Sequence, residues 1–290
     1  VDVVIDDHAC GWLRGVGLDP AAFREKWPGV VLCSITAFGQ DPPDERRHAE
    51  DLTVFHASGW GYHTPGRGHD ELPPLKGPGR FLVSYEAGME AAMCIVAALY
   101  EREDSREGQF IDISKHEVMA ARSDYVLAQF LAGAMDVSTD RGAYDLGGPA
   151  GIFPCRDGHI YVFMSTPAHW QGYRQLLDDP AWARDFPADW LMTALTPERI
   201  AQCRQGWCDW LASRGKDEAA AAAQALGITL VPLNGPADLL ASPQYRHRRY
   251  FAEVSHPVLG TALYPTVPYR LSETPARIAS AAPLLGQHDR

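Results

Sequence analysis

Short apolar runs alternate with helical patterns in the first third of the chain. Residues 1–6 have the pattern of a strand, residues 20–27 have helical spacing with proline at the start, and residues 30–35 form a buried strand pattern without alternation. A strand, a helix and a second strand within about 35 residues predict a parallel βαβ unit. A further helix is predicted over residues 51–60. The fold class is therefore α/β.

The strongest helical pattern covers residues 86–103. Apolar side chains recur there at three-to-four spacing and define one face: Met89, Met93, Val96 and Tyr100. Ser84 stands at the expected N-cap position, and Glu86 falls in the expected first turn, where a negative charge interacts favourably with the helix dipole. A strand over residues 110–114 and a helix over residues 115–131 are predicted to follow.

The pattern changes near Gly147 and Gly148. Residues 151–163 predict a β-hairpin that turns at an Asp-Gly pair, and helices and a strand over residues 228–232 follow. Beyond residue 251 the chain is punctuated by proline and is expected to be extended. Three parts are predicted: a large domain over residues 1–140, a smaller α/β domain over residues 141–245, and a C-terminal segment over residues 246–290 that returns to the large domain.

The composition is that of an ordinary globular protein. Of the 290 residues, 46% are hydrophobic and 22% are charged, which argues against a disordered chain or a fibre. The six cysteines lack a repeated short spacing, so neither a disulfide framework nor a zinc ribbon is predicted. The histidines lack metal-ligand spacing, and no metal site is expected.

The net charge restricts the classes of partner. A formal charge of −11 disfavours nonspecific binding to nucleic acid or to an anionic membrane. The dense basic cluster Arg246-His247-Arg248-Arg249 is either a solvated helix end or interface face, or a contact for phosphate. The chain has neither about 20 uninterrupted apolar residues nor a signal-like start, and a cytoplasmic location is expected.

Specific passages occur in a fixed order along the chain. They include Asp2-Val3-Val4-Ile5-Asp6, Cys33-Ser34-Ile35-Thr36-Ala37-Phe38-Gly39-Gln40, Gly108-Gln109-Phe110, Pro268-Tyr269-Arg270-Leu271-Ser272 and Leu285-Gly286-Gln287-His288. In this order they resemble class III coenzyme A (CoA) transferases, a family that includes formyl-CoA and carnitine-CoA transferases and the related α-methylacyl-CoA racemases. An unrelated nucleotide-binding protein would need a Gly-x-Gly-x-x-Gly turn, which the glycines between Gly11 and Gly17 do not supply.

The resemblance implies a Rossmann-like large domain, a smaller α/β domain and a homodimer with interlocked subunits. It also implies that roughly one βαβ unit of the family precedes the position of Val1. The substrates would be an acyl-CoA and a carboxylic acid. Coenzyme A would enter as a thioester substrate, with no tightly bound cofactor.

The resemblance places the catalytic position at Ser84. Family members carry a carboxylate there, usually Asp, which attacks the thioester and carries CoA as an aspartyl thioester. A hydroxyl cannot replace that step readily, so Glu86 or Glu50 is the alternative carboxylate. In the racemase branch an acid/base pair would occupy the positions of Glu50 and Ser84. Two of these residues also have a structural interpretation, Ser84 as a helix cap and Glu86 as a first-turn acid.

Further residues match positions that contact CoA in the family or could do so. Gln40 either bonds an acyl carbonyl or closes its loop, Lys76 either reaches a phosphate or is solvated, and the glycine pair 147–148 is either a flap over the thioester or a hinge. The full set of candidate CoA-binding residues is Asp7, His8, Phe38, Gly39, Gln40, Lys76, Gly147 and Gly148.

Three functions follow from these observations. The first is a class III CoA transferase with an unknown acyl-CoA and acceptor, whose activity the replacement by Ser84 would impair. The second is a degenerate subunit that binds acyl-CoA or a partner without turnover. The third is an acyl-CoA racemase-like enzyme. Low turnover is expected, because a hydroxyl without a neighbouring base is a poor nucleophile.

Overall fold

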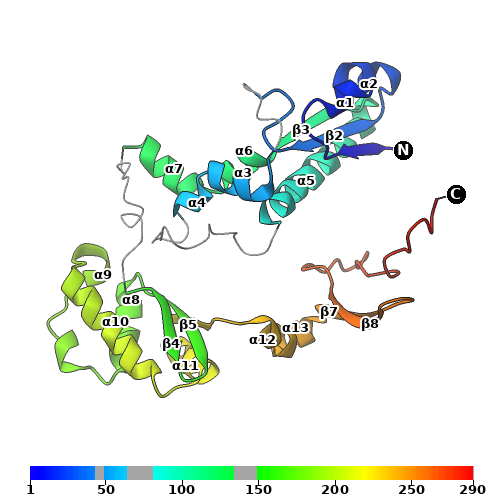
Figure 1. Ribbon diagram of the computed structural model, residues 1–290. Helices are drawn as coiled ribbons and strands as arrows, with labels where there is room; N and C mark the ends of the chain where they lie inside the picture. The colour runs from blue at the N-terminus through cyan, green and yellow to red at the C-terminus, as the bar shows by residue number, and fades with distance from the viewer. Residues whose placement is uncertain (43–48, 64–80, 134–148, 290) are drawn as a thin grey trace. The chain divides into compact units, whose positions relative to one another are not determined.

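The computed structural model describes residues 1–42, 49–63, 81–133 and 149–289. The chain divides into two compact units, unit 1 over Val1–Gly147 and unit 2 over Gly148–Arg290 (Figure 1). Each unit is described by itself.

Unit 1 contains the expected parallel sheet. Its strands β1 (Val3–Asp6), β2 (Val31–Thr36) and β3 (Phe110–Ser114) are parallel and lie in the order β1-β2-β3. The crossover between β1 and β2 contains α2 (Pro20–Lys26), which starts where the proline signal predicted and is capped by the side chain of the preceding Asp19. The short helix α1 (Trp12–Gly15) was not predicted. The α/β class with a parallel sheet is confirmed.

The central strand β2 carries apolar side chains to both faces of this sheet. Leu32 packs with Leu13 and Phe23 of the first two helices, whereas its neighbour Cys33 packs with Ala87 of α5 (Leu82–Ser105). Successive strand residues point to opposite faces, so this alternation places helices on both sides of β2. The apolar run without alternation at residues 30–35 is explained by this two-sided burial.

Helix α5 differs from the prediction at its start. It begins at Leu82 with Phe81 at the N-cap, so Ser84 is the third helical residue and not the cap, and Glu86 lies beyond the first turn. The buried face consists mainly of small residues that allow close approach to β2 and β3: Val83, Ala87, Ala91 and Ala98. The larger apolar stripe is exposed: Tyr85, Met89, Met93, Val96 and Tyr100. By length and hydropathy alone α5 could cross a membrane, a test that a helix packed on a sheet also passes.

Two helices predicted as continuous are each divided in two. The first is α3 (Asp51–Ala57) and α4 (Trp60–His63), separated at Gly59, whose φ of +92° favours glycine. The second is α6 (Lys115–Ala121) and α7 (Asp124–Leu131). Ser114 caps α6 by accepting a hydrogen bond from the N–H of Glu117.

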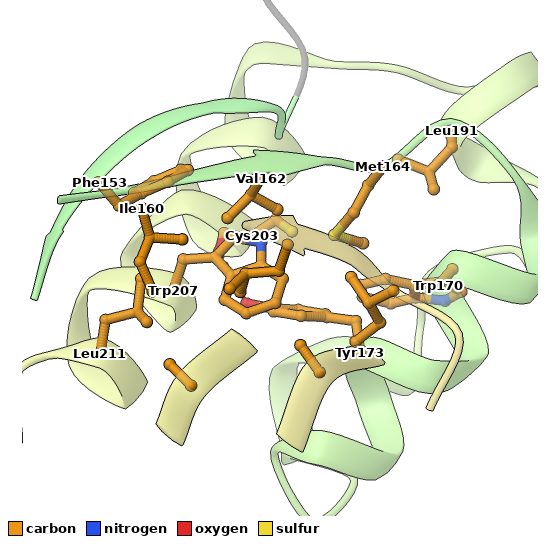
Figure 2. Close-up of a cluster of buried hydrophobic side chains, with 14 of the residues drawn as sticks. Phe153, Ile160, Val162, Met164, Trp170, Tyr173, Leu191, Cys203, Trp207 and Leu211 are labelled. Atoms are coloured by element: carbon orange, nitrogen blue, oxygen red, sulfur yellow. Dashed lines mark hydrogen bonds between the residues drawn. The ribbon is translucent and has the colours of Figure 1, made fainter. Parts of the chain in front are cut away.

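Unit 2 begins with a three-stranded antiparallel sheet in the order β4-β5-β6. The predicted hairpin is present as β4 (Gly151–Cys155) and β5 (Gly158–Phe163), and β6 (Thr229–Pro232) adds to β5. The helical segments between β5 and β6 are α8 (Pro167–Leu176), a 3-10 turn at Ala181–Ala183, α9 (Trp190–Thr193), α10 (Pro197–Leu211) and α11 (Lys216–Gln224). Figure 2 shows the core, in which Trp170, Tyr173 and Trp207 pack beneath Ile160 and Val162.

The C-terminal part of unit 2 has more regular structure than an extended chain. Two short helices, α12 (Pro236–Ala241) and α13 (Pro243–Arg248), precede a hairpin of β7 (Phe251–His256) and β8 (Gly260–Pro265). The sequence pattern did not predict this hairpin, because apolar and polar residues do not alternate regularly in either strand.

Candidate active site

The parallel strands of unit 1 end at one edge of the sheet, here called the carboxyl edge. Helix α5 leads into β3 through a short loop and packs against β2 and β3, so the N-terminus of α5 lies at this edge. Helix α6 follows β3 directly and starts there too. Open parallel sheets bind their ligands outside this edge. Most of the candidate residues belong to segments that begin or end there.

Three side chains from α3, α5 and α6 meet at the N-terminus of α5. The Ser84 hydroxyl donates to Asp51 Oδ1 at 2.8 Å, and the Ser84 backbone N–H donates to Asp51 Oδ2 at 2.9 Å. Lys115 Nζ donates to Ser84 Oγ at 2.9 Å and to Asp51 Oδ1 at 3.3 Å. The Asp51 and Lys115 side chains are 14% and 21% exposed, so both are shielded but accessible. We call these three residues the Asp51 cluster.

A small apolar core fixes the backbone beneath the Asp51 cluster. Val54 and Phe55 of α3, Val83 of α5 and Met119 of α6 are buried against one another. Each is the sequence neighbour of a cluster residue or lies one helical turn from it. The packing of these side chains therefore sets the distances among Asp51, Ser84 and Lys115.

Hydrogen-bond donors and an ammonium group surround the Asp51 carboxylate. Asp51 accepts a backbone N–H from the first turn of a 24-residue helix, where the helix dipole is positive, and it forms an ion pair with Lys115. Such a carboxylate can attack an electrophilic carbonyl carbon or accept the proton of the Ser84 hydroxyl. The expectation that Ser84 lacks a neighbouring base is wrong, because Asp51 contacts its hydroxyl.

The two carboxylates selected from the sequence lie elsewhere. Glu86 Oε2 accepts from Arg122 Nε at 3.0 Å, and Glu90 accepts from the same guanidinium, which raises the pKa of Arg122. Glu50 is the exposed residue that precedes α3, and its side chain makes no capping bond. Among the described residues, Ser84 is thus brought together with Asp51 and Lys115 and not with Glu86 or Glu50.

Gln40 closes a second polar network at the ends of β1 and β2. Its Nε2 donates to Ser34 Oγ at 2.7 Å and its Oε1 accepts from the N–H of Gly11 at 3.2 Å. Ser34 in turn donates to the buried Asp6, which also contacts His8 Nδ1 at 2.7 Å. Both ends of the Gln40 amide are therefore used inside the protein, as loop closure requires.

The other candidate residues are distributed along the same edge. His8 is half exposed and stacks on Trp12 at 3.7 Å between ring centroids, next to the exposed Asp7. Phe38 contacts the ring of His116, and Gly39 has a φ of +84°. Lys76 and the glycine pair 147–148 lie outside the described residues.

Comparison with known proteins places this architecture in one family. The model of CoA-transferase family III matches residues 1–289. The chain belongs to CoA-transferase family III. It is 25% identical to human succinyl-CoA:glutarate CoA-transferase over 99% of its length, and 26% identical to the BbsE subunit of succinyl-CoA:(R)-benzylsuccinate CoA-transferase from Thauera aromatica over 100%. It covers 64% of the human protein and 71% of BbsE, and so spans less than two thirds of the former.

Solved structures support the same fold. The chain superimposes on a CAIB/BAIF family protein from Brucella suis with a TM-score of 0.78 at 21% identity, covering 99% of this chain and 73% of that one. It superimposes on Rv3272 from Mycobacterium tuberculosis with a TM-score of 0.80 at 22% identity, covering 100% and 76%. The expected membership of the family is confirmed.

Sequence reasoning missed two members of the Asp51 cluster. Asp51 is 33 residues from Ser84, and Lys115 is 31 residues from it, so no local spacing connects them. One signal was present in the sequence: Lys115 directly follows a predicted strand, and Asp51 begins a predicted helix. The rule that parallel strands end at one edge would have brought these segments together.

Proposed function

We propose that this member of CoA-transferase family III transfers CoA from an acyl-CoA to a carboxylic acid, with Asp51 as the carboxylate nucleophile. The observation that carries the proposal is the 2.8 Å contact between the Asp51 carboxylate and the Ser84 hydroxyl at the head of α5. The family reaction needs a carboxylate at this place. Asp51 supplies one from α3, next to the residue that occupies the family position.

The proposed steps balance without another reagent. One Asp51 oxygen attacks the thioester carbon, the C–S bond breaks, and CoA leaves as a thiolate with a mixed anhydride on Asp51. The thiolate then attacks the Asp51 carbonyl carbon and releases the first carboxylate, which leaves an aspartyl-CoA thioester. The acceptor carboxylate repeats the two steps in reverse order, and Asp51 is regenerated.

Ser84 and Lys115 would assist these steps by stabilising negative charge. The Ser84 N–H and hydroxyl and the Lys115 ammonium surround the carboxylate, and the same donors can stabilise the oxyanion that forms when its carbonyl is attacked. Their hydrogen bonds also lower the nucleophilicity of the resting carboxylate. We therefore expect slower turnover than a carboxylate at position 84 would give.

A second candidate function is favoured by the same hydrogen bonds. Both Asp51 oxygens already accept protein donors, as in a purely structural ion pair. A subunit that binds acyl-CoA or a catalytic partner without turnover would retain this arrangement. A racemase would need an acid/base pair at positions 50 and 84, and the exposed Glu50 and the Ser84 hydroxyl offer less support for it.

The assembly is the one that the family resemblance implies, and the location is the one that the sequence led us to expect. We propose that two copies pair as an interlocked homodimer, and that the protein acts in the cytoplasm on an acyl-CoA and a carboxylic acid as substrates. The exposed apolar stripe on α5 supports pairing, because a contiguous apolar surface of this kind marks an interface more often than free surface.

Replacement of Asp51 by Asn tests the proposal. Turnover of succinyl-CoA and a panel of dicarboxylic acids should fall by about 10³-fold or more, because an amide cannot form the anhydride. Hydroxylamine added during turnover should convert the aspartyl thioester to a hydroxamate, and peptide mass spectrometry should find it on Asp51. Glu90→Gln is the matched control, because Glu90 is a carboxylate of α5 that contacts Arg122 outside the Asp51 cluster.

The trapping result separates the alternatives. A hydroxamate on Glu86 or Glu50, or an acyl group on Ser84, would show that another residue is the nucleophile. An unmodified protein that binds acyl-CoA but does not turn it over would support the binding subunit and contradict the transferase.

A further inference from the structure

Unit 2 contains a pocket with a strongly basic lining. Its cavity volume is about 910 Å³, and it lies between the end of α13 and the segment 266–276 that follows β8. Arg248, Arg249 and His247 line one side, and Arg270 lines the other. We call it the arginine pocket.

The arginine pocket has no acidic residue to balance these charges. Among the described residues that line it, none is Asp or Glu, and its three arginines appear in none of the ion pairs formed by the described part of the chain. Guanidinium groups stay protonated in proteins. A chain of net charge −11 thus places three permanent positive charges around one cavity, which is an arrangement for an anionic ligand.

The walls of the pocket are held together by hydrogen bonds from both sides. Arg270 Nη2 donates to the carbonyl of His247 at 3.3 Å, and the Thr266 N–H and hydroxyl donate to the carbonyl of Tyr250 at 2.7 and 2.9 Å. These bonds join α13 to the segment after β8. The arginines are therefore part of a formed cavity and not of separate solvated loops.

Arg249 ends α13 in a left-handed backbone conformation, as Arg106 ends α5. Its φ is +53° and its ψ is 44°, the left-handed region that ends many helices and that favours Gly or Asn. A residue other than these two is uncommon at such a position. The assignment of an anionic ligand therefore rests on the charges and the cavity and not on this backbone conformation.

We propose that the arginine pocket binds a phosphate ester. Three guanidinium groups match the planar, bidentate recognition of phosphate oxygens. The cavity is much larger than a phosphate ion, and the half-exposed Tyr269 and Leu271 on its wall offer an apolar surface to an attached organic group. This proposal does not rest on the proposed transferase activity.

Calorimetric titration of the full chain with inorganic pyrophosphate and with adenosine 3′,5′-bisphosphate tests the site. Both should bind, and the organic ester should bind more tightly. Arg249→Asn should weaken each affinity by about tenfold or more, through loss of a charge-assisted contact. Asn suits the left-handed backbone, so this variant should keep the fold, which circular dichroism would verify. Arg270→Gln should act in the same direction.

The matched control is Arg246→Gln. Arg246 lies on α13 and its replacement removes the same charge, but it does not line the pocket. If Arg246→Gln weakened binding as much as Arg249→Asn, the attraction would be general electrostatics and the site would be refuted. Absence of binding to the parent protein would refute it too. Competition by CoA would identify the CoA phosphates as the source of the ester, and failure of CoA to compete would identify a separate phosphorylated ligand.

Discussion

The Ser84 hydroxyl and the Asp51 carboxylate differ in chemistry but lie in contact at the N-terminus of α5. The Ser84 hydroxyl lies 2.8 Å from the nearest Asp51 oxygen, so the carboxylate is one hydrogen bond away from the position that the family resemblance assigns to the nucleophile. A thioester carbonyl that is bound close to the Ser84 hydroxyl needs only a modest shift to come within reach of the Asp51 carboxylate. A shift of about 1 Å can nevertheless cost a large factor in rate, so we expect slow rather than absent turnover.

Relocating the carboxylate tests this interpretation. Ser84→Asp alone would place a second carboxylate against Asp51, and like charges at this distance disfavour ionisation of both. The double variant Ser84→Asp with Asp51→Asn keeps one carboxylate beside Lys115 and returns it to the family position. We expect higher kcat than in the parent protein, measured with succinyl-CoA and dicarboxylic acceptors.

The two single variants are the controls for that experiment. Ser84→Asp should gain less than the double variant, and Asp51→Asn should lose activity. If the double variant folds, binds acyl-CoA and is as inactive as Asp51→Asn, then position 84 does not present a carboxylate to the thioester. The relation between the two positions would then be structural.

The sequence predicted correctly those elements whose own residues carry a clear apolar pattern. Strands β1, β2 and β3 and helices α2 and α5 each carry an apolar pattern over their own residues, so their existence follows from the chain alone. The start of α5 was misplaced because Asp51, from another element, accepts the N–H of Ser84 and stabilises a helix that begins earlier. The Asp51 cluster was missed for the same reason, since its bonds join residues 31 to 64 apart.

At the scale of single elements, Gly172 is tightly packed, whereas Gly88 has open space around it. A Cβ on Gly172 of α8 would lie against the backbone carbonyl of Leu226 and 3.1 Å from a side-chain carbon of Ile228. Gly172→Ala should therefore lower the free energy of unfolding by about 1–3 kcal/mol. Urea denaturation followed by tryptophan fluorescence measures this, because Trp170 and Trp207 are buried in the same core.

Gly88→Ala in α5 is the matched substitution. A Cβ there meets nothing within 4 Å, and alanine is favoured over glycine inside a helix, so a gain of about 0.5–1 kcal/mol is expected. Circular dichroism during the same denaturation reports the helix content of the chain, to which α5 contributes 24 residues. A neutral Gly172→Ala would show that the packing around Gly172 is looser than the distances indicate, and a loss with Gly88→Ala would show that the surroundings of Gly88 are tighter than they indicate.

At the scale of the whole molecule, one side of α5 exposes a stripe of large apolar side chains. Met89, Met93, Val96 and Tyr100 are between 56% and 80% exposed, and a shallow apolar groove runs over Met93, Val96 and Tyr100. The periodicity predicted this stripe, but the face that packs inside unit 1 is the alanine face. A second copy of the chain is the partner that the family resemblance implies.

Pairing through the apolar stripe on α5 predicts the mass of the assembly in solution. Light scattering at micromolar concentration should give twice the 31.9 kDa of one chain. Met93→Glu should shift the protein towards the monomer, because a buried unpaired charge is costly at an interface. Met192→Glu in α9 is the matched control, since Met192 is 69% exposed and Met93 62%. A monomeric parent protein, or equal disruption by both variants, would rule out pairing through α5, whereas selective loss of the dimer with Met93→Glu would place α5 in the interface.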